Sequence, residues 1–128
     1  MRQFMTFVLL VAAGCASRKD AQKEEPTMSP KPTVVFAVRF LPGAKWIAGK
    51  PANEQPGIDD HVRNLGQWHD RELLYCGGPF LDGTGGLSVL RVSSLEKANA
   101  LVAEDPAVRA GLLVSEIHPW LLAFERSE

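Results

Sequence analysis

The sequence predicts an α+β fold with four strands and two main helices, in the order strand, helix, strand, strand, helix, strand. Three observations predict it. Short runs are rich in β-branched and aromatic residues, amphipathic segments lie between them, and glycine or proline stands where one type gives way to the other. This order is that of the split βαβ or ferredoxin-like arrangement, which has an antiparallel sheet.

The first strand is predicted at residues 34–40, because Val-Val-Phe-Ala-Val-Arg-Phe is β-branched and aromatic and stops at Pro42-Gly43. Residues 45–56 are predicted to form a loop, since a helix would not accept so many breaking residues, namely Gly49, Pro51, Asn53 and Pro56.

A helix is predicted from Ile58 to Leu74. Its expected inner side carries residues at helical spacing, with Trp68 beside them, and Asp59 or Asp60 can cap or charge its start. The residues predicted for that side are Ile58, Val62, Leu65, His69 and Glu72.

A hairpin is predicted next, with apolar strands at 73–80 and 86–92 around Asp82-Gly83-Thr84-Gly85. The second helix is expected at 93–103, because serine caps it and Glu96 lies in its first turn.

The chain after residue 104 is predicted to turn at Asp105-Pro106, where Pro106 can start a short helical turn through Ala110. A last strand is expected over 112–117 and 120–124, interrupted at Pro119. In such a sheet one face has no helix. A domain of fewer than about 100 residues would then leave much apolar area uncovered, so we expect a homodimer packed sheet to sheet.

The N-terminus is predicted to be a signal peptide over residues 1–14, since Arg2 precedes an apolar run too short to span a bilayer permanently. The run ends in Val-Ala-Ala-Gly-Cys15, which resembles a bacterial lipoprotein signal, so Cys15 is expected to be lipidated. The alternative is an ordinary secretory signal with a coincidental cysteine. The expected location is the cell envelope, at the periplasmic face of the outer membrane, because Ala16 rather than Asp follows the cysteine.

Residues 15–32 are predicted to be a disordered tether, because they contain three prolines and hardly any large apolar side chain. The folded domain is expected at 33–128, anchored to a membrane rather than crossing it. This domain has nine Lys and Arg against twelve Asp and Glu, a net charge of −3. Nucleic-acid binding is not expected without a cationic face, and a small neutral or polar ligand fits better.

His61 and Asp105 are the candidate proton-transfer pair, because an imidazole held by a carboxylate is a common general acid/base arrangement. The alternative for His61 is a purely structural role as a hydrogen-bonded histidine. The alternative for Asp105 is that its carboxylate caps the following helical turn. The two roles are compatible, since one carboxylate oxygen can cap while the other accepts the imidazole N–H. His69 and His118 lack metal-ligand spacing, so neither a metal nor an organic cofactor is predicted.

A ligand is expected to lie over glycine-containing strand residues, against two aromatic side chains. The residues concerned are Trp68, Gly78, Pro79 and Phe80. A bulge without a ligand is the alternative. Cys76 is expected to be a small buried residue without a disulfide partner if Cys15 is lipidated.

Several of these residues together resemble the YCII-related family. The motifs are His61 in the first helix, Gly78-Pro79-Phe80 followed by Asp82-Gly83, Asp105-Pro106 with Gly111, and Pro119-Trp120. The resemblance covers most of residues 33–124 and implies a dimeric α+β barrel. It also implies an active-site cleft where His61 and Asp105 approach each other. Trp46 and Gln55 match a subgroup with a longer loop, and either cover the cleft as a lid or are merely packed.

The resemblance implies chemistry on a small molecule, since one family member dehydrochlorinates a chlorinated hydroxyhydroquinone. We therefore expect elimination or isomerisation of a small carbonyl or phenolic compound, with His61 as general acid/base and Asp105 orienting it. The alternative is an accessory lipoprotein that binds a ligand or a partner without turnover.

Overall fold

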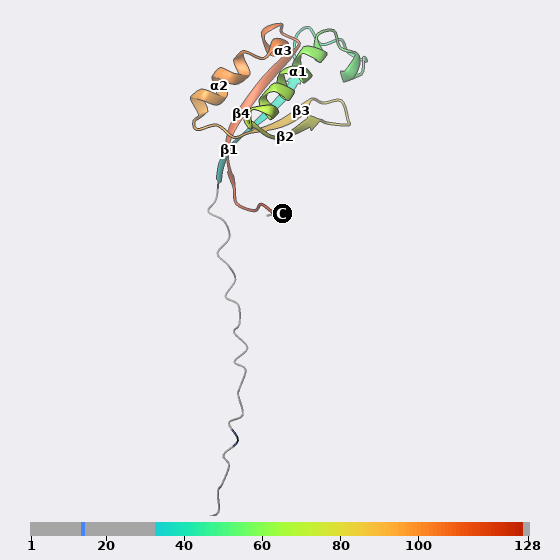
Figure 1. Ribbon diagram of the computed structural model, residues 1–128. Coiled ribbons are helices and arrows are strands. Elements are labelled where there is room, and N and C mark those ends of the chain that lie inside the picture. Colours follow the sequence, from blue (N-terminus) through green and yellow to red (C-terminus); the bar gives the residue numbers. More distant parts are fainter. Residues whose placement is uncertain (1–13, 15–32, 127–128) are drawn as a thin grey trace, which may run out of the picture.

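A computed structural model describes Gly14 and residues 33–126 of the chain. The predicted signal peptide, Cys15 and tether therefore lie outside the described residues, apart from Gly14. The described part is an α+β domain with the predicted strand and helix order (Figure 1). Its elements are β1 (Thr33–Pro42), η1 (Ala52–Glu54), α1 (Ile58–Asp70), β2 (Leu74–Pro79), β3 (Gly86–Leu90), α2 (Leu95–Ala103), α3 (Pro106–Arg109) and β4 (Leu113–Leu122).

The four strands form one antiparallel sheet in the order β2-β3-β1-β4, as the split βαβ arrangement requires. The α-helices lie on one side of this sheet (Figure 1). Strand β1 is central, pairing with β3 from Phe36 to Phe40 and with β4 along its whole length. The α+β fold with an antiparallel sheet is confirmed.

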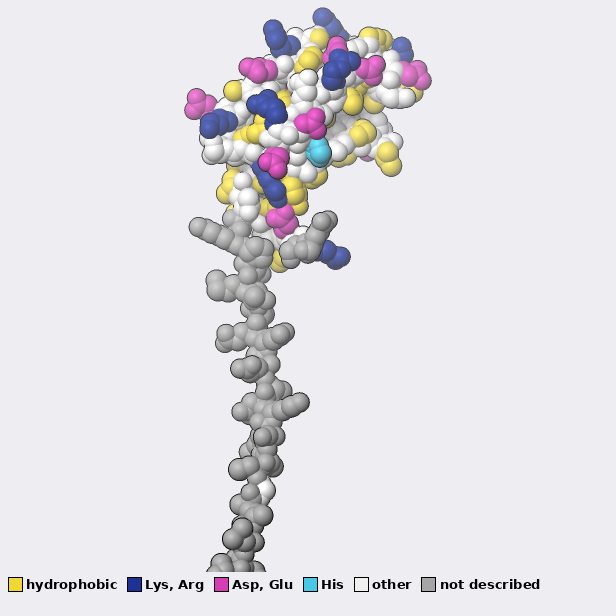
Figure 2. Space-filling model, viewed as in Figure 1, with side chains coloured by type: hydrophobic (Ala, Val, Ile, Leu, Met, Phe, Trp, Pro, Cys, Tyr) yellow, Lys and Arg dark blue, Asp and Glu magenta, His cyan; other side chains and the backbone are white. Residues whose placement is uncertain are grey.

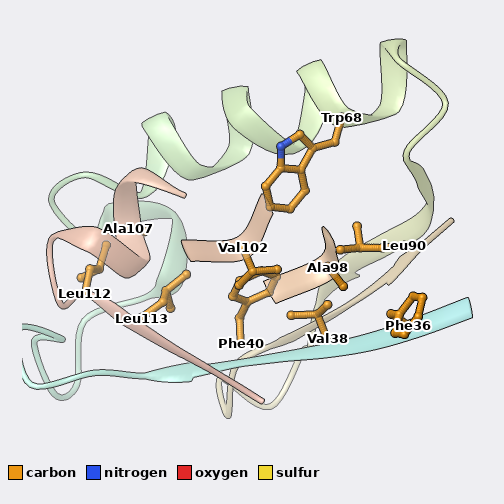
Figure 3. Close-up of a cluster of buried hydrophobic side chains, with 10 residues drawn as sticks. All are labelled: Phe36, Val38, Phe40, Trp68, Leu90, Ala98, Val102, Ala107, Leu112 and Leu113. Carbon is orange, nitrogen blue, oxygen red and sulfur yellow. The ribbon is translucent and has the colours of Figure 1, made fainter. Parts of the chain in front are cut away.

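The core lies between the sheet and the helices. Alternate residues of β1 face the helices, since successive side chains of a strand point to opposite sides. In Figure 3 the side chain of Trp68 points from α1 into this cluster, toward Phe40 and Val102. The buried cluster comprises Phe36, Val38, Phe40, Trp68, Leu90, Ala98, Val102, Ala107, Leu112 and Leu113.

Helix α1 is shorter than predicted, and its inner side is rotated: Ile58 and Leu65 pack against the core as predicted, whereas Val62, His69 and Glu72 are exposed. It ends at Asp70, where Glu72 adopts a φ of +59° and the Leu73 N–H donates to the Trp68 carbonyl at 2.9 Å. Gly57, with a φ of +91°, is its N-cap in place of an aspartate. The buried residues of α1 are His61 and Trp68, whereas Val62 is 61% exposed.

Strand β4 is continuous, so the predicted interruption at Pro119 is wrong. Pro119 pairs with Phe36 in an unbroken register from Leu113 to Leu122. Because β4 is an edge strand, alternate N–H groups of its backbone point away from the sheet. A proline, which lacks the N–H, is tolerated at such positions.

The other face of the sheet carries no helix and is partly apolar; Val35 and Val89 are buried on it. Val114 and Trp120 on β4 are each nearly half exposed there, beside an ion pair between Arg39 and Glu116 at 3.0 Å. In Figure 2 charged side chains of both signs are spread over the helix side, and hydrophobic ones gather mainly along the lower border of the domain.

Cys76 is exposed, contrary to the expectation that it is buried. It belongs to the edge strand β2 and lies opposite Val89, a residue on the face without helices. A register shift between Leu74 and Cys76 puts the two on different faces. No helix within residues 33–126 combines the length and the apolar character needed to cross a bilayer.

Candidate active site

The Asp105 carboxylate is the fixed point of the site. Asp105 follows α2 and is fully buried, and it is the N-cap of α3. Its Oδ1 accepts the backbone N–H groups of Ala107 at 3.0 Å and Val108 at 3.3 Å. Pro106 at the first helical position needs no partner, because it has no N–H. The predicted capping role is therefore seen in the geometry.

The second oxygen of Asp105 faces α1. His61 Nδ1 lies 2.9 Å from Asp105 Oδ2, and Asn64 Nδ2 donates to the same oxygen at 2.7 Å. An ionised carboxylate only accepts hydrogen bonds, so Nδ1 carries the proton and Nε2 of a neutral imidazole is left as an acceptor. The structure thus brings together the two residues predicted to pair.

His61 is held on a second side by an aromatic ring. The side chain is almost buried, and the Phe40 ring meets the imidazole edge to face at 4.8 Å between centroids. The carboxylate and the ring together fix the orientation of the imidazole, which proton transfer requires.

The environment keeps Asp105 ionised. Burial is the largest single influence and by itself raises the pKa of this carboxyl. The hydrogen bond and charge of His61, with the hydrogen bonds from Asn64 and the Val108 N–H, outweigh it and hold the pKa of Asp105 below its usual value. An ionised Asp105 accepts the Nδ1–H of His61 and so fixes the tautomer of the imidazole.

A cavity of about 210 Å³ lies between α1 and the β2-β3 hairpin, and His61 lines it. Most of its wall is apolar, and polar side chains are few. The apolar wall comprises Phe40, Trp46, Ala52, Ile58, Val62, Leu65, Pro79, Leu87 and Leu113, and the other lining residues are Asn53, Asp59, His61, Gly78, Gly85, Gly86 and Ser88.

Two of the four predicted ligand-binding residues line this cavity. Gly78 and Pro79 do so from β2. Trp68 is only 2% exposed and belongs to the core, and Phe80 lies beyond the end of β2, so neither is among the lining residues.

Four polar residues of the site were not predicted as site residues, namely Asn53, Asp59, Asn64 and Ser88. Asn64 could have been found from its spacing, since a residue three positions after His61 lies on the same side of a helix. Asp59 stands one residue inside α1 at the cavity wall. Ser88 reaches the cavity from β3, and its alternation with apolar neighbours gives no signal that it faces the site.

The long loop before α1 is fastened by Gln55, which is 3% exposed. Its amide accepts from the Ile47 N–H at 2.9 Å and donates to the Ile47 and Lys50 carbonyls at 2.8 and 2.9 Å. These bonds hold the segment that places Trp46 at the cavity wall. Trp46 thus lies where the lid interpretation puts it, and Gln55 packs behind it.

The described residues contain no group of three or more His, Cys, Asp or Glu side chains placed to hold a metal ion. The polar groups that face the cavity are an imidazole, a carboxylate, an amide and a hydroxyl, and this set can move protons and form hydrogen bonds.

We expect Asp105→Asn to destabilise the domain by about 1–3 kcal/mol or more, because an amide leaves one pair of buried donors facing an NH₂ group. Since the pKa of Asp105 is lower in the folded state, its charge stabilises the fold above the unfolded pKa of about 3.9. That contribution is lost as the pH falls through the folded pKa. Urea unfolding between pH 7 and pH 2.5 checks both effects.

In Asp105→Asn the loss of stability below about pH 4 is expected to be smaller than in the wild type. Glu104→Gln, at the exposed neighbouring position, is the matched control and retains the wild-type pH dependence. If Asp105→Asn and the wild type lost the same free energy of unfolding below about pH 4, the lowered pKa of Asp105 would be contradicted.

Comparison with known proteins places the chain in a family. The model of the YCII-related domain matches residues 34–121. The uncharacterized protein YjpA of Bacillus subtilis (strain 168) is 34% identical over 68 residues, which cover 53% of this chain and 80% of that protein.

A similar solved structure is that of 5-chloro-2-hydroxyhydroquinone dehydrochlorinase from Burkholderia phenoliruptrix AC1100, in complex with 2,5-dihydroxybenzoquinone. It superposes with a TM-score of 0.50 at 22% sequence identity, covering 67% of this chain and 92% of that one. This likeness concerns the fold. Taken with the family match over most of the domain, it leads to one conclusion: the chain belongs to the YCII-related domain family.

Proposed function

We propose that this domain is a cofactor-free enzyme that uses His61 for general acid/base proton transfer on a small carbonyl or phenolic compound. The observation that carries the proposal is the buried hydrogen bond between His61 and Asp105 beside an apolar cavity. Asp105 holds the proton on Nδ1 and leaves Nε2 to a molecule in the cavity.

The reaction class is elimination or isomerisation. In an elimination, His61 Nε2 takes one proton from the substrate, the C–H or O–H electrons form the new double bond, and the leaving group departs with its bonding pair. In an isomerisation, the imidazolium returns the proton at another atom. Asp105 stabilises the imidazolium in either case, and the apolar wall strengthens that interaction by excluding water.

The neighbouring enzyme supports this class of substrate. That enzyme is a dehydrochlorinase, and its bound molecule is a small oxygenated ring. At 22% identity the two chains share the scaffold, and the kind of ligand is carried over as part of this proposal.

We expect His61→Gln to lower kcat/KM by about 10²- to 10⁴-fold, because it removes the general base. The test is chloride release from 5-chloro-2-hydroxyhydroquinone, with calorimetric binding of 2,5-dihydroxybenzoquinone measured in parallel.

His69→Gln is the matched control, since His69 lies on the same helix with its side chain 73% exposed. It is expected to retain the wild-type rate. Full turnover by His61→Gln would refute the mechanism. Binding of the quinone without turnover by the wild type would favour the accessory role of a ligand-binding lipoprotein.

The domain is further proposed to be a homodimer joined through the face of its sheet that carries no helix. The exposed Val114 and Trp120 support this, because apolar side chains on a sheet of this size are ordinarily covered. We expect light scattering of residues 33–128 to give a dimer at micromolar concentration and Trp120→Glu to give a monomer. Leu81→Glu, at a fully exposed hairpin position, should remain dimeric. A monomeric wild type would refute the proposal.

The proposed location is the periplasmic face of the outer membrane, through a lipid on Cys15. This rests on the sequence Val-Ala-Ala-Gly-Cys15 alone. Labelled palmitate is expected to be incorporated into the full-length protein in a Gram-negative host, and Cys15→Ser should abolish it. Cys76→Ser, which changes the other cysteine, should leave the label in place. Equal labelling of wild type and Cys15→Ser would overturn the anchor.

A further inference from the structure

Asp59 is a charged side chain that lines the cavity and has no part in the proposed proton transfer. Among the described residues that line the cavity it is the one Asp, Glu, Lys or Arg. It lies in the first turn of α1 and is exposed, whereas His61, two residues further on, is only 7% exposed. A mainly apolar cavity thus has one carboxylate at its wall.

Helical geometry puts Asp59 and His61 on opposite flanks of the cavity. Successive residues of an α-helix are about 100° apart around its axis, so these two side chains leave α1 about 200° apart. Ile58, Val62 and Leu65 lie between them around the axis and line the cavity as well. His61 therefore stands at the buried flank, and Asp59, beside the 61% exposed Val62, stands at the flank that opens to solvent.

The Asp59 carboxylate is not neutralised by any of the described residues. None of the ion pairs and side-chain hydrogen bonds between residues 33 and 126 involves it. Arg63 stands four residues further along α1, at the spacing of a helical ion pair, but it donates to Asp60 at 2.6 Å. Since no Lys or Arg is among the described lining residues, this wall of the cavity is negatively charged.

The position of Asp59 makes its charge act on the outer end of a ligand. A cavity of about 150 Å³ in another protein holds benzene, so about 210 Å³ here accommodates one six-membered ring with a small substituent. When an oxygen at one end of the ring faces His61, the other end lies toward the open flank, beside Asp59. A carboxylate there attracts a cation and repels an anion, because a mainly apolar wall of low dielectric focuses its field.

We propose that Asp59 is a specificity-determining residue that selects ligands by charge. It favours a ligand whose outer end, remote from His61, is cationic, and it disfavours one that carries a carboxylate or another anion there. The favoured class is a single-ring compound with a protonated amine at the outer end. This inference rests on the proposed function only for the ligand oxygen at His61.

The test compares three phenols with side chains of similar size. Tyramine ends in an ammonium group, tyrosol in a hydroxyl and 4-hydroxyphenylacetate in a carboxylate. Their affinities for the full-length protein are measured by calorimetry at low ionic strength. The wild type is expected to prefer tyramine over 4-hydroxyphenylacetate by about three- to thirtyfold, with tyrosol between them. The preference should shrink at high salt, which screens an exposed carboxylate.

Asp59→Asn keeps the size of the side chain and removes its charge. It should lose most of the preference for tyramine and bind tyrosol as the wild type does. Asp60→Asn is the matched control, because it removes the same charge from the next residue, which does not line the cavity. The folded domain has a net charge of −3, which attracts any cation, and Asp60→Asn changes that net charge equally. It should retain the wild-type preference.

An equal preference in the wild type and Asp59→Asn would overturn the inference. An equal loss in Asp60→Asn would assign the preference to net charge and overturn it too, as would failure of all three phenols to bind the wild type. Binding is measured without turnover, so the two proposals can fail separately. If chloride release is absent but the preference depends on Asp59, the specificity role stands and the catalytic proposal falls. Chloride release that depends on His61, without a preference that depends on Asp59, gives the reverse.

Discussion

The buried Asp105 carboxylate is the interaction on which the rest of the site depends. Its two oxygens accept four hydrogen bonds, two from the first turn of α3 and two from side chains of α1. A buried carboxylate is costly unless it is fully hydrogen-bonded, so α1 and α3 must lie in one relative position to satisfy it. The same constraint that joins the helices therefore fixes the imidazole of His61.

Much of this arrangement is local in the sequence and could be predicted. Asp105 before Pro106 indicates a helix cap, and the order of strands and helices predicts that the start of the first helix lies near it. That His61 is the residue it meets was inferred from the residue types, and the family resemblance strengthened the inference. The geometry adds Asn64, one helical turn away, as a second donor to the same oxygen.

The two wrong predictions of ligand-binding residues, Trp68 and Phe80, share a physical origin in distance and register. Trp68 follows His61 by seven residues, so it lies on the same stripe of α1 but about 10.5 Å farther along the axis, past the cavity and inside the core. Phe80 follows Pro79, whose neighbour in the ladder is Gly86, and alternation turns the next residue away. Such positions are decided by where a cavity ends, which periodicity does not encode.

The cavity itself reflects a conflict between packing and binding. Apolar space inside a domain is ordinarily filled by side chains, because filling it buries more apolar area and stabilises the fold. Here about 210 Å³ stays open between α1 and the hairpin, and Gln55 fastens the loop that places Trp46 at its wall. A preformed void beside an oriented imidazole reduces the reorganisation that a ligand must drive on binding.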